Sequence, residues 1–329
     1  MMIACGSLRR CVVLCLLTVV SNLVCACQDC TDSIVSGRFF TPREHALVDM
    51  LDTCVPLSTK RALNWHCKAD ILHCCRFTVR YKRAGDWFAG HCGFGGAVDR
   101  LSPGSTCSQL DISIGGTIHN ICTPEGMAFF IIDALEMCTG ATMLSGLPCS
   151  TFVWLSRGTS MRSVLNHWLG DCHHRPEVHE ANVIFSRLIL LIRILILRLV
   201  QWIIEQPLTS CAFKLNMCKA LVRSKPAIRL PCSTRTLRIR RHLLWLGHYG
   251  HAVPKPTVLV GMTRAIHRLK TVRPKKQSTQ VVKFTTLKWV VKNNKWKLVR
   301  RMYGCKRELK NTQIYPRAFC EEVVRHQLA

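Results

Sequence analysis

Capped helical segments alternate with short apolar runs through the middle of the chain. Thr123-Pro124-Glu125 predicts a helix start, because Thr is favoured at the N-cap and Pro at the first helical position; the helix should end near Met137. The apolar residues 141–144 then predict a strand. Residues 183–204 are almost wholly apolar and predict a core helix followed by a buried strand over 200–204. This alternation is typical of an α/β fold with a parallel sheet.

The N-terminal part has weaker patterns. Thr41-Pro42-Arg43-Glu44 repeats the capping chemistry and predicts a helix through about Leu51. Residues 75–81 predict a strand. The polar residues 80–85, by contrast, are unfavourable for the strand that should precede the glycine-rich residues 86–96.

Two stretches have the composition of membrane-directed segments. Residues 1–26 look like a secretory signal, with Arg9-Arg10 before an apolar run and small residues at Val24-Cys25-Ala26; an N-terminal anchor or a misassigned start is the alternative. Residues 183–204 are long enough to span a bilayer. Each arginine within them would cost about 2.5–3.5 kcal/mol near the bilayer centre, which favours the core helix.

Residues 281–299 alternate apolar and polar positions around Lys292-Asn293-Asn294-Lys295. Asn tolerates positive φ and suits a tight turn, so the segment predicts a basic hairpin. It carries Trp289 and Trp296, and aromatic side chains among cations fit stacking on nucleic-acid bases. Packing of both Trp side chains on the protein body is the alternative. Residues 273–278 predict a short linker before the hairpin.

The charge of the chain lies almost entirely in its second half. The 329 residues carry a net charge of +27 at pH 7, of which residues 1–205 contribute +2 and residues 206–329 contribute +25. Such segregation predicts a near-neutral body joined to a basic region that meets a polyanion. Nucleic acid is the first partner to consider and an anionic membrane the second; a merely solvated basic surface is the remaining alternative.

The 21 cysteines form no recognisable framework. Paired CxxC motifs at zinc-binding spacing are missing, and removal of residues 1–26 would leave an odd number of thiols. His248 and His251 have no third ligand nearby in the sequence, so we predict a loop pair and no metal site.

Residues 86–96 form a glycine-rich stretch that should lie between a strand and a helix. Glycine permits φ > 0 and lets a ligand approach the backbone closely, so such a loop can seat a nucleotide-like cofactor. Asp111 follows about 20 residues later, where an acid at the end of the second strand can bind ribose hydroxyls. A plain turn is the alternative.

Two more candidate residues follow strand-like runs. Cys149 stands beside Pro148 just past residues 141–144, and Glu205 ends the run 200–204. Open α/β sheets keep their chemistry at the carboxyl ends of the strands. A thiol held there can act as a nucleophile, and a carboxyl as a general acid or base. A free loop thiol and a surface carboxylate are the alternatives.

Taken in order, these motifs resemble those of the DNA cytosine-5 methyltransferases over roughly residues 84–255. Phe88-Ala89-Gly90 followed by Gly93 resembles the Phe-x-Gly-x-Gly cofactor loop of that family, and Asp111 stands where its ribose-binding acid would fall. Pro148-Cys149 resembles its Pro-Cys nucleophile motif, and Glu205-Gln206-Pro207 its Glu-Asn-Val motif. The wider phrases, together with Thr312-Gln313-Ile314-Tyr315-Pro316, are similar to divergent protist members. The residues implied to bind the cofactor are Phe88, Ala89, Gly90, Gly93, Asp111 and Pro148.

The resemblance implies a Rossmann-like S-adenosylmethionine-dependent methyltransferase sheet that acts on cytosine C5 in DNA. Cys149 would add to cytosine C6, and Glu205 would bond or protonate the ring N3. Ser150, Arg238 and Arg240 would contact the base or its phosphates, and basic residues beyond 206 would hold DNA, in preference to RNA, during base flipping. The thiol would need a lowered pKa and the carboxyl a raised one. A nuclear location would follow, whereas residues 1–26 indicate the secretory pathway or an organelle.

Several positions depart from the family pattern. Leu147, Ser150 and Gln206-Pro207 replace Pro, Gln and Asn-Val, and the Gln-x-Arg-x-Arg motif is missing. Two alternatives therefore stand beside the enzyme: a catalytically inactive nucleic-acid-binding descendant, and a secreted or membrane-associated basic protein. The expected organisation is a signal-like segment (1–26), an N-terminal extension (27–83), a methyltransferase-like α/β core (84–207) and a basic nucleic-acid-binding region (208–329).

Overall fold

The computed structural model describes residues 41–230, 236–251, 254–271, 285–292, 295–302 and 314–328. The chain divides into two compact units, Met1–His45 and Ala46–Ala329, and both the sheet and the candidate site belong to the second. The predicted signal-like segment 1–26, the linker 273–278 and the turn at Asn293-Asn294 lie outside the described residues.

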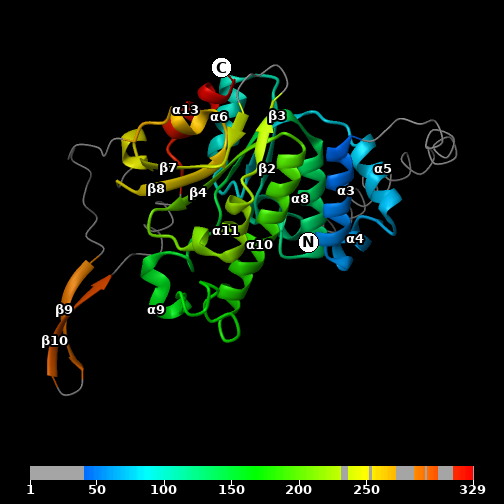
Figure 1. The fold of residues 1–329 in the computed structure, drawn as a ribbon. Coiled ribbons are helices and arrows are strands. Elements are labelled where there is room, and N and C mark those ends of the chain that lie inside the picture. Colours follow the sequence, from blue (N-terminus) through cyan, green and yellow to red (C-terminus); the bar gives the residue numbers. More distant parts are fainter. Residues whose placement is uncertain are drawn as a thin grey trace, which may run out of the picture. The chain divides into compact units, whose positions relative to one another are not determined.

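A mixed sheet of six strands forms the centre of the second unit (Figure 1). Its strands are β1 (Lys82–Trp87), β2 (Thr106–Leu110), β3 (Met137–Ser145), β4 (Gln201–Pro207), β7 (Arg240–Trp245) and β8 (Pro256–Met262). They lie in the order β2-β1-β3-β4-β8-β7; the first four are parallel, and β8 is antiparallel to both of its neighbours. The protein is therefore α/β, as predicted, and its sheet is compatible with a Rossmann-like fold.

Helices precede, connect and follow these strands. The α-helices are α3 (Pro42–Cys54), α4 (Leu57–Ala62), α5 (Lys68–Phe77), α6 (Gly93–Leu101), α7 (Ile112–Gly115), α8 (Pro124–Glu136), α9 (Arg157–Ser160), α10 (Pro176–Leu197), α11 (Asn216–Arg223) and α13 (Arg317–Leu328). Short 3-10 helices are η1 (Gly116–His119), η2 (Trp154–Ser156), η3 (Ala212–Lys214), η4 (Leu246–Tyr249) and η5 (Ala265–His267). Two hairpins form separate two-stranded sheets: β5 (Ala227–Arg229) with β6 (Thr236–Arg238), and β9 (Thr285–Lys292) with β10 (Lys295–Met302).

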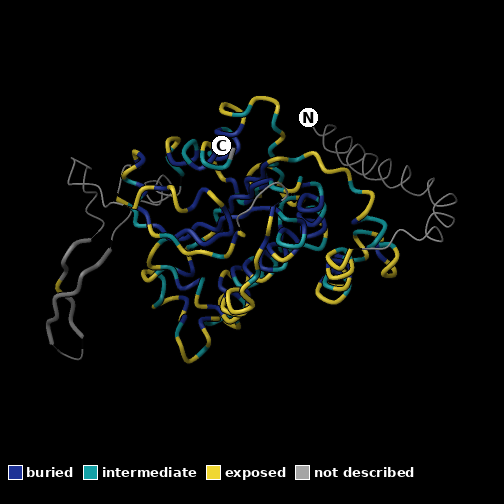
Figure 2. The backbone as a smooth tube through the Cα atoms, turned by 45° about the horizontal axis from the view of Figure 1, so that its top comes forward, coloured by how far each residue is buried: buried dark blue, intermediate teal, exposed yellow. Residues whose placement is uncertain are grey.

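The alternation of side chains along the strands divides the apolar residues between two cores. Trp87, Trp202 and Ile204 belong to a large cluster that includes residues of α8 and α10. Leu144 and Ile203 belong to a second cluster with residues of α6 and α13. Successive strand residues point to opposite faces of a sheet, which is why the neighbours Ile203 and Ile204 lie in different cores. Helices thus cover both faces, and the buried backbone in Figure 2 follows the strands between them.

Most of the predicted elements are present. Helix α3 begins at Pro42 and α8 at Pro124, and the hydroxyl of Thr123 accepts a hydrogen bond from Gly126 N at 3.0 Å, as its capping role requires. The strands predicted over 141–144 and 200–204 lie in β3 and β4. The basic hairpin is also confirmed, since β9 and β10 pair antiparallel over their full length.

The first strand is where the pattern misleads. The strand predicted over residues 75–81 is wrong, because α5 continues to Phe77. Strand β1 instead uses the polar residues that follow. Lys82 forms ion pairs with Asp133 (2.6 Å) and Glu136 (2.5 Å) of α8, so its charge is compensated where it is buried.

Helix α10 contains most of the stretch that has the length of a membrane span. Its Arg187 donates hydrogen bonds to the backbone carbonyls of Ile121 and Thr123, and Arg198, just past its end, donates to that of Leu135. These arginines therefore tether the helix to the segments around α8. Among the helices of the described residues, none combines the length and the apolar character needed to cross a membrane.

The expected boundary at residue 207 does not divide the fold. Strands β7 and β8 lie beyond it yet belong to the main sheet, and β8 pairs directly with β4. Helix α13, at the far end of the chain, contributes Phe319 and Val323 to the same core as α6. The second half of the chain thus supplies part of the α/β body as well as the basic hairpin.

Asp133 links β1, β2 and α8, and its loss should destabilise the fold. Its carboxylate, 1% exposed, accepts hydrogen bonds from Trp87 Nε1 (2.7 Å) and Ser108 Oγ (3.0 Å) as well as from Lys82. We expect Asp133→Ala to lower the free energy of unfolding by about 3 kcal/mol, because the buried Trp87 and the partly buried Lys82 and Ser108 lose their acceptor. Urea denaturation measures this change.

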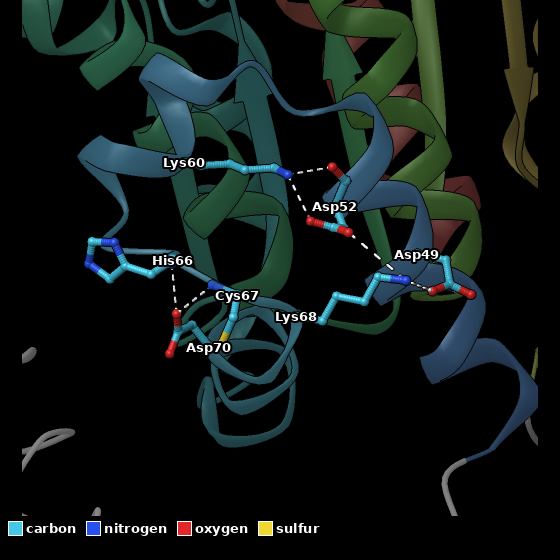
Figure 3. A network of polar contacts seen from close by, with 7 residues as sticks. All are labelled: Asp49, Asp52, Lys60, His66, Cys67, Lys68 and Asp70. Atoms are coloured by element: carbon cyan, nitrogen blue, oxygen red, sulfur yellow. Dashed lines mark hydrogen bonds and ion pairs between the residues drawn. The ribbon is translucent and has the colours of Figure 1, made fainter.

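The control is Asp49→Ala, which removes the exposed ion pair between Asp49 and Lys68 (Figure 3). It should leave the midpoint unchanged within error, since exposed pairs contribute little. Equal midpoints for wild type and Asp133→Ala would contradict the role given to the buried network.

Candidate active site at the carboxyl edge of the sheet

One row of paired residues brings the predicted site positions together. Leu110, Trp87, Ser145 and Ile204 are register partners across β2, β1, β3 and β4. The residues that follow this row are Asp111, Phe88, Gly146 and Glu205; the first three leave the sheet, whereas Glu205 continues β4 and pairs with Leu259 of β8. Because the four strands are parallel, these positions share one edge of the sheet. The chain also reverses its direction of winding between β1 and β3, which is where open α/β sheets bind ligands.

The loop after β1 makes a compact turn into α6. Phe88 N and Ala89 N both donate to Leu110 O, at 2.6 and 3.1 Å, so the loop is fastened to the end of β2. Gly90 and Cys92 have φ of 52° and 54°, in the left-handed region that glycine adopts without strain. The ring of Phe88 stacks on Phe130 of α8 with centroids 5.7 Å apart. The predicted glycine-rich loop between strand and helix is therefore present.

Asp111 faces this loop from the end of β2. Its Oδ2 accepts a hydrogen bond from Gly90 N at 3.1 Å, and its Oδ1 accepts from Ser113 N at 2.8 Å, which caps the short helix α7. Asp111 is half-buried, and no described atom lies within 4 Å of the place that a Gly90 side chain would take. The backbone of Gly90 and a carboxylate thus border open space, as a ribose-binding position requires.

Asp86, the penultimate residue of β1, lies under the same loop and was not singled out in the sequence. Its carboxylate accepts hydrogen bonds from the backbone N–H groups of Gly95 (3.0 Å) and Phe94 at the start of α6. Burial raises the pKa of Asp86 to about 7, although these hydrogen bonds act in the opposite direction. In the sequence, the only indication of this role was that Asp86 precedes the glycines. The fold shows that its carboxylate accepts hydrogen bonds from the first turn of α6.

Cys149 and Glu205 come together at the ends of β3 and β4. Gly146 N donates to Trp87 O at 3.1 Å, which carries the Cys149 loop back over the end of β1. Glu205 is 4% exposed, and its negative charge acts on the half-buried Cys149 thiol. The structure therefore places a sulfur and a carboxyl, 56 positions apart in the sequence, in one electrostatic environment.

The expectation of a lowered thiol pKa is not met. Burial and, to a smaller extent, the charge of Glu205 raise the pKa of Cys149 to about 11, although the nearby charge of Lys255 lowers it. Desolvation disfavours the thiolate, and a facing carboxylate adds to that effect. In the structure as it stands, Cys149 is a thiol and not a thiolate.

Two residues that the sequence did not indicate complete the surroundings of Glu205. Lys255 Nζ lies 3.7 Å from Glu205 Oε1, and Tyr315 Oη donates a hydrogen bond to Glu205 Oε2 at 2.9 Å. Lys255 also lies over the Tyr315 ring, 5.7 Å from its centroid. Lys255 immediately precedes β8. Because β8 runs antiparallel to β4, the start of β8 lies at the carboxyl edge of the parallel strands, and Lys255 lies there with it. Tyr315 lies in a motif noted in the sequence but given no role there.

Gln206 and Arg162 fix the loop that carries Cys149. Gln206 Nε2 donates to Leu147 O at 3.1 Å, and Gln206 Oε1 accepts from Ser210 Oγ at 2.9 Å. The buried guanidinium of Arg162 donates to Thr151 O (2.9 Å) and Thr151 Oγ1 (3.0 Å). Gln206 is one of the departures from the family pattern, and its amide has a structural role in this chain.

The remaining predicted residues lie differently. Pro148 and Ser150 flank Cys149 and are exposed. Arg240 begins β7 in register with Gly261, so β8 separates it from β4, and Arg238 lies in β6, which pairs with β5 outside the main sheet. Among the described residues, Glu205 contacts Lys255 and Tyr315, and no contact with either arginine is found.

No family model, curated protein or solved structure matches this chain. What the site can do is therefore inferred from its own residues. In the described part of the chain every cysteine is a free thiol, and no three His, Cys, Asp or Glu side chains gather as a group of metal ligands.

The stability of the fold should depend on the titration of Asp86. Below about pH 4 its carboxyl is protonated in both folded and unfolded chains. As the pH rises to 7 the unfolded chain loses this proton while the folded chain keeps it, so stability falls by up to roughly 4 kcal/mol over this window. In Asp86→Asn we expect that part of the fall to disappear, as measured by urea denaturation between pH 4 and 8. The same substitution at exposed Asp99 of α6 is the control; identical pH profiles for wild type and Asp86→Asn would refute the assignment.

The reactivity of Cys149 should follow the two charges beside it. At pH 8 we expect Glu205→Gln to accelerate alkylation of Cys149 by iodoacetamide, because the charge that raises its pKa is gone, and Lys255→Met to slow it. Mass spectrometry of the Cys149 peptide gives the rates. Cys218, whose pKa burial alone raises to about 12, is the internal control and should not respond. Unchanged Cys149 rates in both variants would show that the three groups do not interact.

Proposed function

We propose that this protein is an S-adenosylmethionine-dependent methyltransferase that acts on cytosine C5 in DNA. The observation that carries the proposal is the meeting of Cys149 and Glu205 at the carboxyl edge of the sheet, beside the loop that follows β1. The order of the strands supports it as well, since the winding reverses between β1 and β3. The sequence resemblance supplies the identity of the reaction.

The residues near the β1 loop fit the proposed cofactor. S-adenosylmethionine supplies an electrophilic methyl group when it is bound. Gly90 borders open space, and the half-buried carboxylate of Asp111 beside it can accept hydrogen bonds from ribose hydroxyls. Phe88 and Ala89 also lie in the loop, Gly93 begins α6, and Pro148 is exposed in the neighbouring loop that carries Cys149.

The chemistry proposed for the pair begins with the proton on Cys149. A proton that leaves the thiol and is taken up by Glu205 removes the charge that opposes thiolate formation. The thiolate then forms a bond to cytosine C6, and the carboxyl gives the proton to N3. C5 becomes nucleophilic and takes the methyl group. The C5 proton is then lost to water, the C6–sulfur bond breaks, and the N3 proton returns by way of Glu205 to the departing sulfur, which restores the aromatic ring and the free thiol.

Lys255 is the cation nearest this pair among the described residues. Its charge lowers the pKa of Cys149, opposing the effects of burial and Glu205. We therefore assign to Lys255, ahead of Arg238 and Arg240, the role of stabilising negative charge at the reacting centre. Ser150 remains a proposed base contact.

The hairpin β9–β10 supports nucleic acid as the partner. By register, one face of the ribbon carries the positions of Lys288, Lys292, Lys295, Lys297 and Arg301. Trp289 and Trp296 fall on the opposite face. Lys292 and Lys295 occupy directly opposed positions, where like charges disfavour pairing unless an anion binds. Arg300 falls on the face of the two tryptophans, but the other five cations fall on the opposite face, which favours contacts with backbone phosphates.

A second candidate is a catalytically inactive nucleic-acid-binding descendant. The raised pKa of Cys149 favours it, because a nucleophile must lose its proton before it can react. The departures at Leu147 and Gln206 point the same way, whereas the basic hairpin serves both candidates equally.

Methyl transfer to DNA separates the two candidates. We expect wild-type protein to move labelled methyl from S-adenosylmethionine to cytosine in DNA, and Cys149→Ser to lose at least about a thousandfold of that rate. The matched control is Cys138→Ser, which should retain activity. Cys138 is also a partly buried thiol, but it lies near the start of β3, away from the carboxyl edge. Salt-dependent DNA binding without transfer, on single-stranded and duplex substrates alike, would instead identify the inactive descendant.

A further inference from the structure

Tyr315 lies where three segments of the site meet. Its hydroxyl donates to Glu205, 110 positions earlier in the chain, at the end of β4. The same hydroxyl lies 2.5 Å from the place that a Cβ on Gly146 would take, in the Cys149 loop. Its Cβ lies 3.6 Å from the corresponding place on Gly93, the first residue of α6. Glycine at 146 is therefore required by the position of the Tyr315 side chain.

Packing holds Tyr315 in this place. Its ring contacts Phe319 of α13 with centroids 5.7 Å apart, and Phe319 in turn contacts Tyr249. Phe319 is fully buried in the core that α13 shares with α6. Tyr315 lies just before α13, and the packing of this helix in the core holds the Tyr315 hydroxyl beside Glu205.

The two oxygens of Glu205 have different surroundings. Oε2 accepts the hydrogen bond from Tyr315. Oε1 is buried and has no hydrogen-bond partner among the described residues; Lys255 Nζ, at 3.7 Å, is beyond hydrogen-bonding distance. A buried carboxylate oxygen without a donor is costly, so this is the oxygen that is available to a ligand.

We propose that Tyr315 is the positioning residue of Glu205: by occupying Oε2 it fixes the rotation of the carboxyl and directs Oε1 to the substrate. This inference rests on the proposed function, because it names the oxygen that would exchange a proton with the cytosine ring. In this role Tyr315 acts through Glu205.

The charged groups around the pair are consistent with this role. Glu205 is faced by Tyr315, Lys255 and Cys149, and Tyr315 is faced also by Asp86 and Cys320. Burial and the charge of Glu205 raise the pKa of Tyr315 well above its ordinary value. The hydroxyl therefore keeps its proton throughout the neutral range and remains a donor.

A double-mutant cycle tests the proposal without relying on methyl transfer. The variants are Tyr315→Phe, Glu205→Gln and the pair combined, and the readout is the rate of Cys149 alkylation by iodoacetamide at pH 8. Tyr315→Phe removes the hydrogen bond that fixes the carboxyl, so the carboxylate is free to turn away from the thiol and its charge opposes the thiolate less. We expect alkylation to accelerate by up to about tenfold, the effect of one pKa unit. In the Glu205→Gln background the same change should have no effect.

The matched control is Tyr249→Phe. Tyr249 belongs to the same aromatic cluster, but its hydroxyl accepts from Lys270 N and does not contact Glu205. It should leave Cys149 alkylation unchanged. An equal effect of Tyr315→Phe with and without the Glu205 carboxyl, or an effect no larger than that of Tyr249→Phe, would overturn the proposal and leave Tyr315 a packing residue.

Methyl transfer distinguishes this outcome from a failure of the proposed function. If wild type transfers methyl groups, Tyr315→Phe should lower kcat and shift its pH profile while KM for S-adenosylmethionine stays unchanged. Active enzyme with no coupling in the cycle overturns the role of Tyr315 alone. Coupling in the cycle with no transfer by wild type supports the orientation of Glu205 by Tyr315 and overturns the methyltransferase.

Discussion

The pairing of β3 between β1 and β4 is the constraint on which the site depends. The parallel pairing of these three strands ends in one row, so the residues that follow it lie at one edge of the sheet, although β4 itself continues to Pro207 against β8. Glu205 follows directly from this row, and Cys149 lies four positions past the end of β3. The two cores on either face hold the strands in this order, because alternate residues of each strand are buried in one core or the other.

The reversed strand β8 adds what the parallel strands cannot. Its amino end lies at the edge where the parallel strands have their carboxyl ends, so the residue before it, Lys255, reaches Glu205. Helix α13 adds Tyr315 from the end of the chain by packing beside α6. The surroundings of one carboxyl are thus assembled from β4, β8 and the segment before α13, which are far apart in the sequence.

The buried carboxylates of this fold differ in whether a cation lies within hydrogen-bonding distance of them. Asp133 is compensated by a cation and by neutral donors, which suits a group that only links strands to a helix. Asp86 and Glu205 receive hydrogen bonds but no cation within hydrogen-bonding distance. Burial raises the pKa of Asp86 to about 7, and both acids lie near the carboxyl edge of the parallel strands, where open α/β sheets bind ligands.

The sequence alone determined the elements whose signals are local. Capping at Thr41 and Thr123, the apolar runs of β3 and β4 and the alternation of the two hairpin strands depend on neighbouring residues, and these elements formed as predicted. It also indicated the order in which Cys149 and Glu205 would leave the sheet. Only the tertiary structure decided that Lys82 could begin a central strand, that Lys255 and Tyr315 would surround Glu205, and that the Cys149 thiol would be harder to ionise. Each of these three outcomes depends on burial and on charges from distant segments. Residues that are close in sequence indicate neither the burial nor the distant charges.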